Sequence, residues 1–189
     1  MVLSVFVLMI RRPPRATQWR SSAASDVYKR QQLEWLRRLE QDHDNLRAAL
    51  EWALEHDGMA QGDDEWALRL SGALHLFWRM RGHFHEGRSW LAKSLGQCLE
   101  RHSAARAAAL FAKGSLLYAL GDVSAGRLLA EESAAIYREL GDEHGLAQVL
   151  AFIGLTLVWQ GEASLAQTRL EEALALCRTA GDRWQEAYA

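Results

Sequence analysis

The stretch "YALGDVSAGRLLAEESAAIYRELGD" runs from Tyr118 to Asp142, and "VWQGEASLAQTRLEEALALCRTAGD" runs from Val158 to Asp182, forty residues later. The two align without a gap, and the match extends upstream to cover 104–142 and 144–182. Self-similarity at a fixed period of this length is typical of stacked helical repeats. The positions that carry the match include Gly114 and Gly154, Gly121 and Gly161, Glu131-Glu132 and Glu171-Glu172, and Gly141-Asp142 and Gly181-Asp182.

Each copy predicts two helices. Apolar residues recur at helical spacing over 104–120, Gly121-Asp122 supplies a stop and a start signal, and 123–140 follows as a second helix. Gly114 lies in the middle of the first helix, where glycine is unfavourable, so we expect a close approach of the paired helix there. Ala, Leu, Glu and Arg dominate the chain while Thr and Ile are scarce, which argues against a sheet. The predicted fold is all-α, an αα-hairpin superhelix.

A weaker copy lies upstream and sets the domain boundaries. It covers about 64–102 and aligns at a shift of 39, with His75 where the later copies have Gly114 and Gly154. We therefore predict repeats at 64–102, 104–142 and 144–182, the start of a truncated repeat at 183–189, and a helical linker at 32–63 that precedes them. A bulky His75 makes close packing in the first hairpin doubtful.

Residues 1–31 differ from the rest of the chain. They carry a net charge of +5 against −7 for the remainder, and their apolar run is too short for a membrane span. Their basic residues follow the apolar run, whereas in a signal peptide they precede it. The segments "LMIRRPPR" and "SSAASDVYKRQ" resemble translated sequencing-adapter read-through, so we expect a non-native or disordered leader that can at most form an incidental helix.

The spacing of small residues in the repeats resembles the tetratricopeptide repeat. The residues concerned are Gly114, Gly121, Gly126, Ala130 and Ser133 in the middle copy, and Gly154, Gly161, Ala166, Leu170 and Ala173 in the last. The segment "DNLRAAL" (44–50), together with the repeats after it, resembles the sensor region of bacterial MalT- and LuxR-type signal-transduction ATPases of the STAND class. In that family an ATPase precedes this region and an effector domain lies at one end, which implies that the chain is a fragment of a transcriptional regulator.

The resemblance also implies where a ligand binds. First helices of such repeats line a concave groove, and the corresponding positions here include aromatic and arginine side chains suited to capture of a peptide or small molecule. The alternative for Phe111 and Trp159 is packing between repeats. The expected groove residues are Arg69, Leu76, Arg79, Phe111, Ser115, Tyr118, Gln148, Leu155, Val158 and Trp159. Five other tryptophans lie on apolar faces and are expected in the core: Trp35, Trp52, Trp66, Trp78 and Trp90.

The chemical candidates favour a non-enzymatic chain. There is no phosphate-loop motif, and the segment from His83 to Glu86 has loop-like rather than metal-ligand spacing. Asp42 and Asp44 read as helix caps, and neither Cys98 nor Cys177 has an evident base. We expect no catalytic residue, no metal and no cofactor.

The predicted function is a non-catalytic ligand- or protein-binding repeat module of a bacterial signal-transduction or transcriptional regulator in the cytoplasm. The expected partners are a protein or peptide segment, or a small effector molecule, in the groove. The acidic balance of 32–189 argues against nucleic-acid binding by this fragment, and no membrane contact is expected. Self-association through an uncapped C-terminal end is a further expectation. Two alternatives are a docking arm of a larger enzyme, such as a cyclase or protein kinase, and a stand-alone adaptor.

Overall fold

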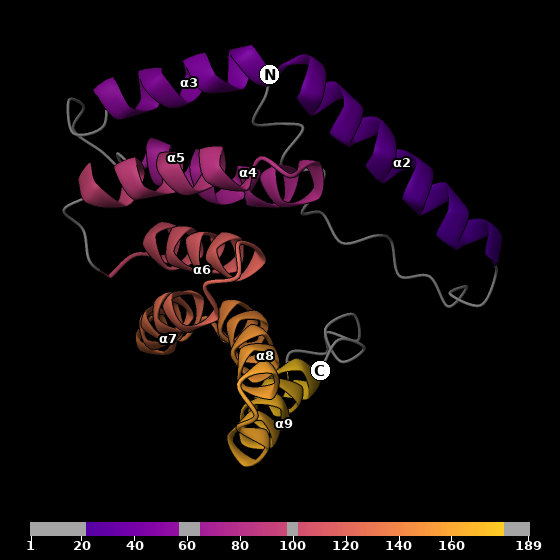
Figure 1. The fold of residues 1–189 in the computed structure, drawn as a ribbon, viewed down its shortest axis with the longest axis vertical. Coiled ribbons are helices and arrows are strands. Elements are labelled where there is room, and N and C mark those ends of the chain that lie inside the picture. Colours follow the sequence, from indigo (N-terminus) through magenta and orange to yellow (C-terminus); the bar gives the residue numbers. More distant parts are fainter. Residues whose placement is uncertain (1–21, 57–64, 98–101, 180–189) are drawn as a thin grey trace. The chain divides into compact units, whose positions relative to one another are not determined.

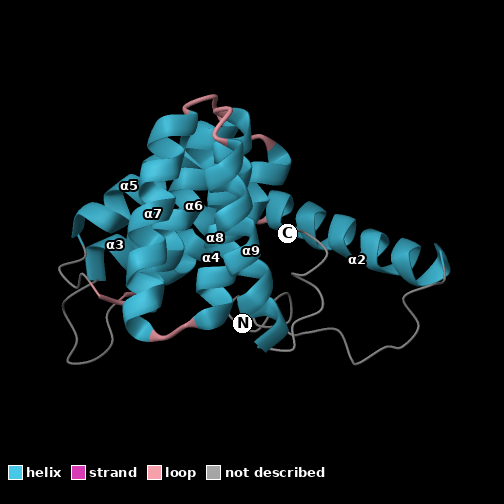
Figure 2. Cartoon of the chain, turned by 90° about the horizontal axis from the view of Figure 1, so that it is seen from below, coloured by secondary structure: helices cyan, strands magenta, loops and turns pink. Residues whose placement is uncertain are grey.

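A computed structural model describes residues 22–56, 65–97 and 102–179, with side chains described within these ranges from 31 to 178. Within these ranges all regular structure is helical, which confirms the all-α class (Figure 1 and Figure 2). None of the helices described there combines the length and the hydrophobicity that a bilayer crossing requires. The helices are α2 (Ser22–Gln41), α3 (His43–His56), α4 (Trp66–Arg81), α5 (Phe84–Gln97), α6 (Ala104–Ala119), α7 (Val123–Leu140), α8 (Glu143–Trp159) and α9 (Ala163–Thr179).

The chain divides into two compact units, Met1–Ala48 and Ala49–Ala189. In the first unit α2 begins at Ser22, so it crosses the boundary predicted at residue 31, while residues 1–21 of the expected leader lie outside the described part. On α2 the Arg38 guanidinium pairs with Glu34 and lies 5.0 Å from the centre of the Trp35 ring. Trp35 is thus partly covered by its own helix.

The second unit contains three helical hairpins, α4/α5, α6/α7 and α8/α9. Within each hairpin the two helices pack together, and the first helix of the next hairpin packs against the one before. Thus α6 packs on both α4 and α5, and α8 packs mainly on α7 with fewer contacts to α6 (Figure 1). The predicted helix 123–140 is confirmed at both ends, and the helix predicted over 104–120 ends one residue earlier.

The predicted turn between the paired helices is confirmed in its detail. Gly121 has φ +91° and Gly161 has φ +79°, a left-handed conformation that favours glycine. The next helix start is capped where the sequence predicts it, because Asp122 Oδ1 accepts a hydrogen bond of 3.1 Å from the backbone N–H of Ala125. Asp142 caps α8 in the same way through Gly145 N–H, at 2.9 Å.

The paired helices approach most closely in the middle hairpin. A Cβ added to Gly114 would lie 2.7 Å from the carbonyl oxygen of Gly126, and a Cβ on Gly126 would lie 2.7 Å from that of Gly114. Two glycines on facing helices therefore allow the backbones to touch. At Gly154 the corresponding neighbour is the Leu170 side chain at 2.6 Å, so the third hairpin is filled by a side chain rather than by backbone.

The first hairpin, where His75 replaces the small residue, packs through other glycines. A Cβ on Gly87 of α5 would lie 2.6 Å from the Trp78 ring, so the indole occupies the space that this glycine leaves open. A Cβ added to Gly72 of α4 would lie 3.6 Å from the backbone nitrogen of Ala109 and 3.7 Å from the Cβ of Ala108, both on α6, which are ordinary van der Waals distances. The close packing that His75 made doubtful is thus supplied by residues at other positions.

The expected core tryptophans fall into two groups. Trp78 and Trp90 are buried, as predicted, and Trp35 is partly buried. The prediction was wrong for Trp52 and Trp66, which are exposed. Trp52 lies about 200° around α3 from the buried Leu50, and its ring stacks on His56 with centroids 4.5 Å apart. Trp66 is the first residue of α4, ahead of the buried Ala67 and Leu68.

Candidate functional site

The first helix of the first hairpin, α4, presents three predicted site residues to solvent. Arg69, Leu76 and Arg79 are all exposed, Leu76 by 53%. Met80, one turn after Leu76, is exposed as well. The repeat alignment already places Met80 at a groove-facing position, that of Trp159, although it is not in the list of expected groove residues. We call Leu76, Arg79 and Met80 the α4 patch.

The three predicted residues on α6 lie differently. Phe111 and Ser115 are buried and Tyr118 is partly buried. Phe152 of α8 contacts both aromatic rings edge to face, with centroids 5.5 Å from Phe111 and 5.5 Å from Tyr118. Phe111 and Ser115 are therefore not accessible to a ligand in this structure. Phe111 packs between hairpins, as in the alternative given for it above.

A difference between repeats explains why the rings of Phe111 and Tyr118 are covered. Phe152 aligns with Ala112 at the forty-residue shift, so a large ring on α8 replaces the small residue of α6. That ring fills the space beside Phe111 and Tyr118, and positions that would face solvent in a regular repeat become interior.

On α8 all four predicted residues are exposed: Gln148, Leu155, Val158 and Trp159. Among the described large hydrophobic residues, Trp159 has the largest exposed fraction, 72%. Leu155 and Trp159 are four residues apart and share one helix face. They occupy the repeat positions of Leu76 and Met80 on α4. We call Leu155, Val158 and Trp159 the α8 patch.

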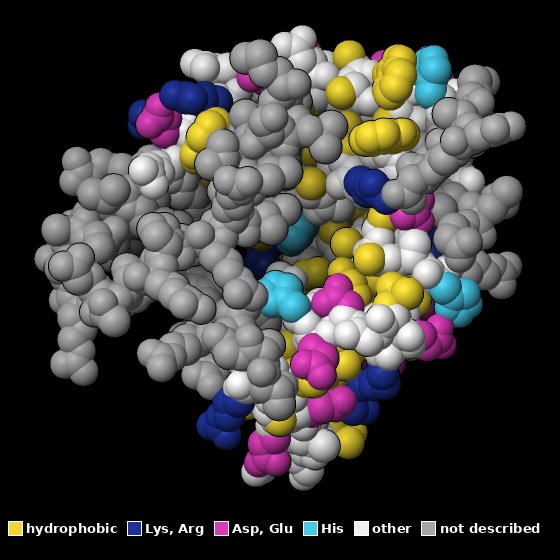
Figure 3. Space-filling view, turned by 180° about the vertical axis from the view of Figure 1, so that it is seen from behind, with side chains coloured by type: hydrophobic (Ala, Val, Ile, Leu, Met, Phe, Trp, Pro, Cys, Tyr) yellow, Lys and Arg dark blue, Asp and Glu magenta, His cyan; other side chains and the backbone are white. Residues whose placement is uncertain are grey.

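The charges near the α4 patch are positive. Arg79 has no ion-pair partner among the described residues, whereas Arg69 lies 4.0 Å from Glu65. Between them His75 has a pKa lowered from 6.5, chiefly because its burial disfavours the charged form; a hydrogen bond to Gly72 opposes this and the Arg79 charge adds to it. Figure 3 shows hydrophobic side chains lying among charged residues and histidines on one face of the molecule.

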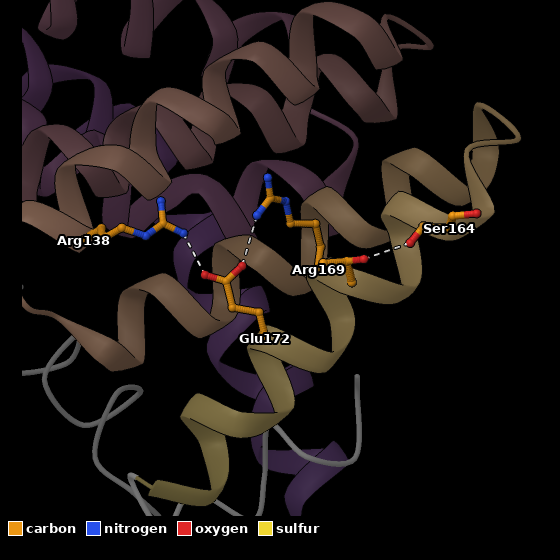
Figure 4. Close-up of polar contacts among 5 residues, drawn as sticks. Arg138, Ser164, Arg169 and Glu172 are labelled. Atoms are coloured by element: carbon orange, nitrogen blue, oxygen red, sulfur yellow. Dashed lines mark hydrogen bonds and ion pairs between the residues drawn. The ribbon is translucent and has the colours of Figure 1, made fainter.

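The recurring glutamates hold neighbouring helices together. Glu172 of α9 receives hydrogen bonds from Arg138 of α7 at 2.8 Å and from Arg169 of its own helix at 3.1 Å (Figure 4). Glu132 of α7 lies 3.7 Å from Arg106 of α6. The second glutamate of each pair thus forms an ion pair with a neighbouring helix, whereas Glu131 and Glu171 contact Arg127 and Gln167 of their own helices. The ion pairs are partly exposed and contribute modestly to stability.

The remaining chemical candidates lie apart from both patches in the sequence. His83 precedes α5 and His85 lies in its first turn, so the histidines predicted to be in a loop belong partly to a helix. Asp42 lies at the turn between α2 and α3, and Asp44 lies in the first turn of α3. Cys177 is buried in α9, and Cys98 lies outside the described residues.

Comparison with known proteins relates the chain to regulators. It is 34% identical over 155 residues to proteins of Mycobacterium bovis and of two strains of Mycobacterium tuberculosis, whose names describe them as candidate HTH-type transcriptional regulators. The chain is similar to one part of these regulators. The match covers 78% of this chain but 17% of each relative, so the chain spans about a sixth of their length. No family model matches the sequence.

The two buried serines of the middle hairpin offer a matched test of its packing. Ser115 Oγ is buried without a hydrogen-bond partner in the described structure, whereas Ser133 Oγ donates a 2.7 Å hydrogen bond to the Ala107 carbonyl. We expect Ser115→Ala to raise the free energy of unfolding by about 0.5–1 kcal/mol and Ser133→Ala to lower it by about 1 kcal/mol. Urea unfolding of both variants measures this, and equal losses in the two would contradict it.

Proposed function

We propose that the chain is a non-catalytic, tetratricopeptide-like binding module of a bacterial HTH-type transcriptional regulator of the STAND ATPase class. The observation that carries the proposal is the 34% identity to a limited part of named HTH-type regulators. The three successive hairpins support the solenoid part, because each buries its apolar face against its neighbour as stacked repeats do.

The binding surface in this proposal consists of the α4 and α8 patches. Both present apolar side chains at equivalent repeat positions on the first helices of their hairpins, the helices that line the groove in a tetratricopeptide solenoid. Large exposed apolar side chains gain free energy when a partner covers them, and tryptophan is enriched at the centres of such interfaces. The occupant would be a protein or peptide segment, or a small effector molecule, with an acidic group for Arg79.

Binding would regulate the parent protein by shifting its conformational equilibrium. A ligand that binds one arrangement of the module more tightly than another favours that arrangement in proportion to the difference in affinity. DNA binding and ATP hydrolysis would belong to other parts of the regulator, in the cytoplasm. The purified chain is then expected to show no ATP turnover, and robust hydrolysis would contradict the proposal.

A binding experiment tests the surface directly. Peptides selected from a phage-displayed library of amphipathic sequences against the full 189-residue chain should lose about tenfold in affinity with Trp159→Ala, because a buried aromatic anchor contributes about 1.4 kcal/mol or more. Titration calorimetry measures the dissociation constants. Leu76→Ala should weaken binding in the same direction if both patches contact one ligand.

Leu128→Ala is the matched control. Leu128 is an exposed leucine on α7, a second helix of its hairpin, and its removal should leave the affinity unchanged. A parallel thermal-shift screen of small metabolites tests whether the occupant is a small effector molecule instead of a peptide. Selected ligands whose affinity responds to Leu128→Ala but not to Trp159→Ala would place the binding surface elsewhere and contradict the proposal.

A further inference from the structure

A histidine lies at the contact between the first hairpin and the helix that follows it. The imidazole of His75 on α4 meets the Phe111 ring of α6 edge to face, with centroids 5.8 Å apart. One turn earlier, Gly72 of the same helix lies against the backbone of Ala109. His75 is therefore part of the packing surface between α4 and α6 and is not a free surface group.

The hydrogen bonding of His75 shows which ring nitrogen carries the hydrogen when the imidazole is neutral. Nδ1 lies 3.0 Å from the carbonyl oxygen of Gly72, and because a carbonyl only accepts, Nδ1 carries the hydrogen. A second proton would have to bind Nε2, which has no hydrogen-bond partner among the described residues. His75 is partly buried, so protonation would place a positive charge next to an apolar ring in a side chain that is only partly hydrated.

The charged groups around His75 do not favour its protonation. On α4 the charge that acts on it is that of Arg79, one turn away and of the same sign. On α6, Arg106 contacts the Leu95 carbonyl and Glu132, and Lys113 lies about 200° around the helix from Phe111. On α5 the contact to α4 is made by Gly87 against Trp78, with Glu86 and Arg88 beside it in sequence. Among the described residues no carboxylate acts on His75.

We propose that uptake of a proton by His75 loosens the packing of α4 on α6, so that the first hairpin opens at mildly acidic pH while the other two hairpins remain folded. The close packing contacts of the middle and last hairpins, Gly114 with Gly126 and Phe152 with Phe111, contain no histidine or carboxylate, and the ion pairs Arg106–Glu132 and Arg138–Glu172 between their helices are partly exposed. Opening would displace Leu76 and Arg79, which flank His75, and so alter the α4 patch.

The direction of the pH effect follows from the preference of the packed state for neutral histidine. Above the ordinary pKa of 6.5 His75 is neutral in both the packed and the open state, so pH has no effect through this group. Below 6.5 the open state binds a proton more readily than the packed state, in which the pKa of His75 is lowered, so opening becomes more favourable as the pH falls. The opening constant should rise by up to about tenfold per pH unit in that range.

Hydrogen exchange by mass spectrometry on the full chain tests this proposal. Between about pH 7.5 and about pH 5.5, and after correction for intrinsic exchange rates, peptides from α4 should lose protection by up to about tenfold while peptides from α8 and α9 change little. His75→Phe and His75→Gln should each abolish this pH dependence, since neither side chain titrates. The two replacement side chains differ in size, so a loss of the pH dependence in both variants cannot be caused by a change in packing alone.

His85→Gln provides the matched control, because His85 is an exposed histidine on the neighbouring helix α5 and its removal should leave the pH dependence intact. An NMR titration of the His75 ring gives a second measurement. The proposal is overturned if the α4 protection loss persists in both His75 variants, or if His75 titrates at or above its ordinary pKa, as it would if Phe111 stabilised the cation. The packing change needs no ligand, so the result stands whether or not the α4 patch binds one.

Discussion

Gly114→Ala is expected to lower the free energy of unfolding by roughly 2–3 kcal/mol, in spite of the better helix propensity of alanine. The added Cβ would lie 2.7 Å from the Gly126 carbonyl oxygen, which is backbone and cannot move without shifting α7. The helices would have to separate, and the contacts of the middle hairpin would be lost along their length. Urea unfolding followed by circular dichroism measures the loss.

Two other mid-helix glycines make the experiment a graded series. The Cβ of Gly154→Ala would clash with the Leu170 side chain, which can change rotamer, and would lie at an ordinary 3.5 Å from the Ala166 carbonyl oxygen, so a loss of about 1 kcal/mol or less is expected. Gly72→Ala finds its nearest neighbour at 3.6 Å and should be neutral or stabilising, by up to about 1 kcal/mol from helix propensity. Equal effects at the three positions would show that backbone contact does not determine the cost.

Trp78→Ala should be the most damaging single substitution considered, with a loss of about 3–5 kcal/mol. The indole is buried, and it lies where Gly87 of α5 and Leu116 of α6 come together, so three helices surround it. Truncation leaves a cavity that these helices can fill only by moving. The free energy of unfolding and the cooperativity of the transition are the quantities to measure.

Trp159→Ala is the control for the loss of a tryptophan as such. Its ring is 72% exposed, and removal of an exposed side chain usually changes stability by less than about 0.5 kcal/mol. A loss at Trp159 comparable with that at Trp78 would mean that the α8 patch is packed in solution, by another molecule or by a part of the chain outside the described residues.

Local signals in the sequence predicted the helices well. The Gly-Asp pairs fixed the turns because a left-handed residue and a capping carboxylate are properties of single positions. The pairing of helices through small residues was also predictable. Glycine is unfavourable in a helix interior, so Gly114 indicates that a neighbouring helix must approach closely there. These features depend on residues close together in the chain.

Exposure of the candidate site was less predictable, because it depends on what the neighbouring helix contributes. A rule that assigns groove positions by repeat number assumes equivalent neighbours, but Phe152 lies where the previous copy has Ala112, and its ring packs on Phe111 and Tyr118. In the same way, the compensation for His75 by Gly72 and Gly87 involves three helices and no recognisable motif. Such substitutions are visible only once the packing partners are known.

The packing of each hairpin on the one before it also determines how the protein can acquire its structure. The main helix contacts join neighbours in the chain, so most of them are formed between segments of short sequence separation. Chains of this kind have low contact order and fold rapidly, because little loop entropy is lost before the first contacts form. Each hairpin can therefore settle onto its predecessor during synthesis, and the ribosome need not release the whole chain before folding starts.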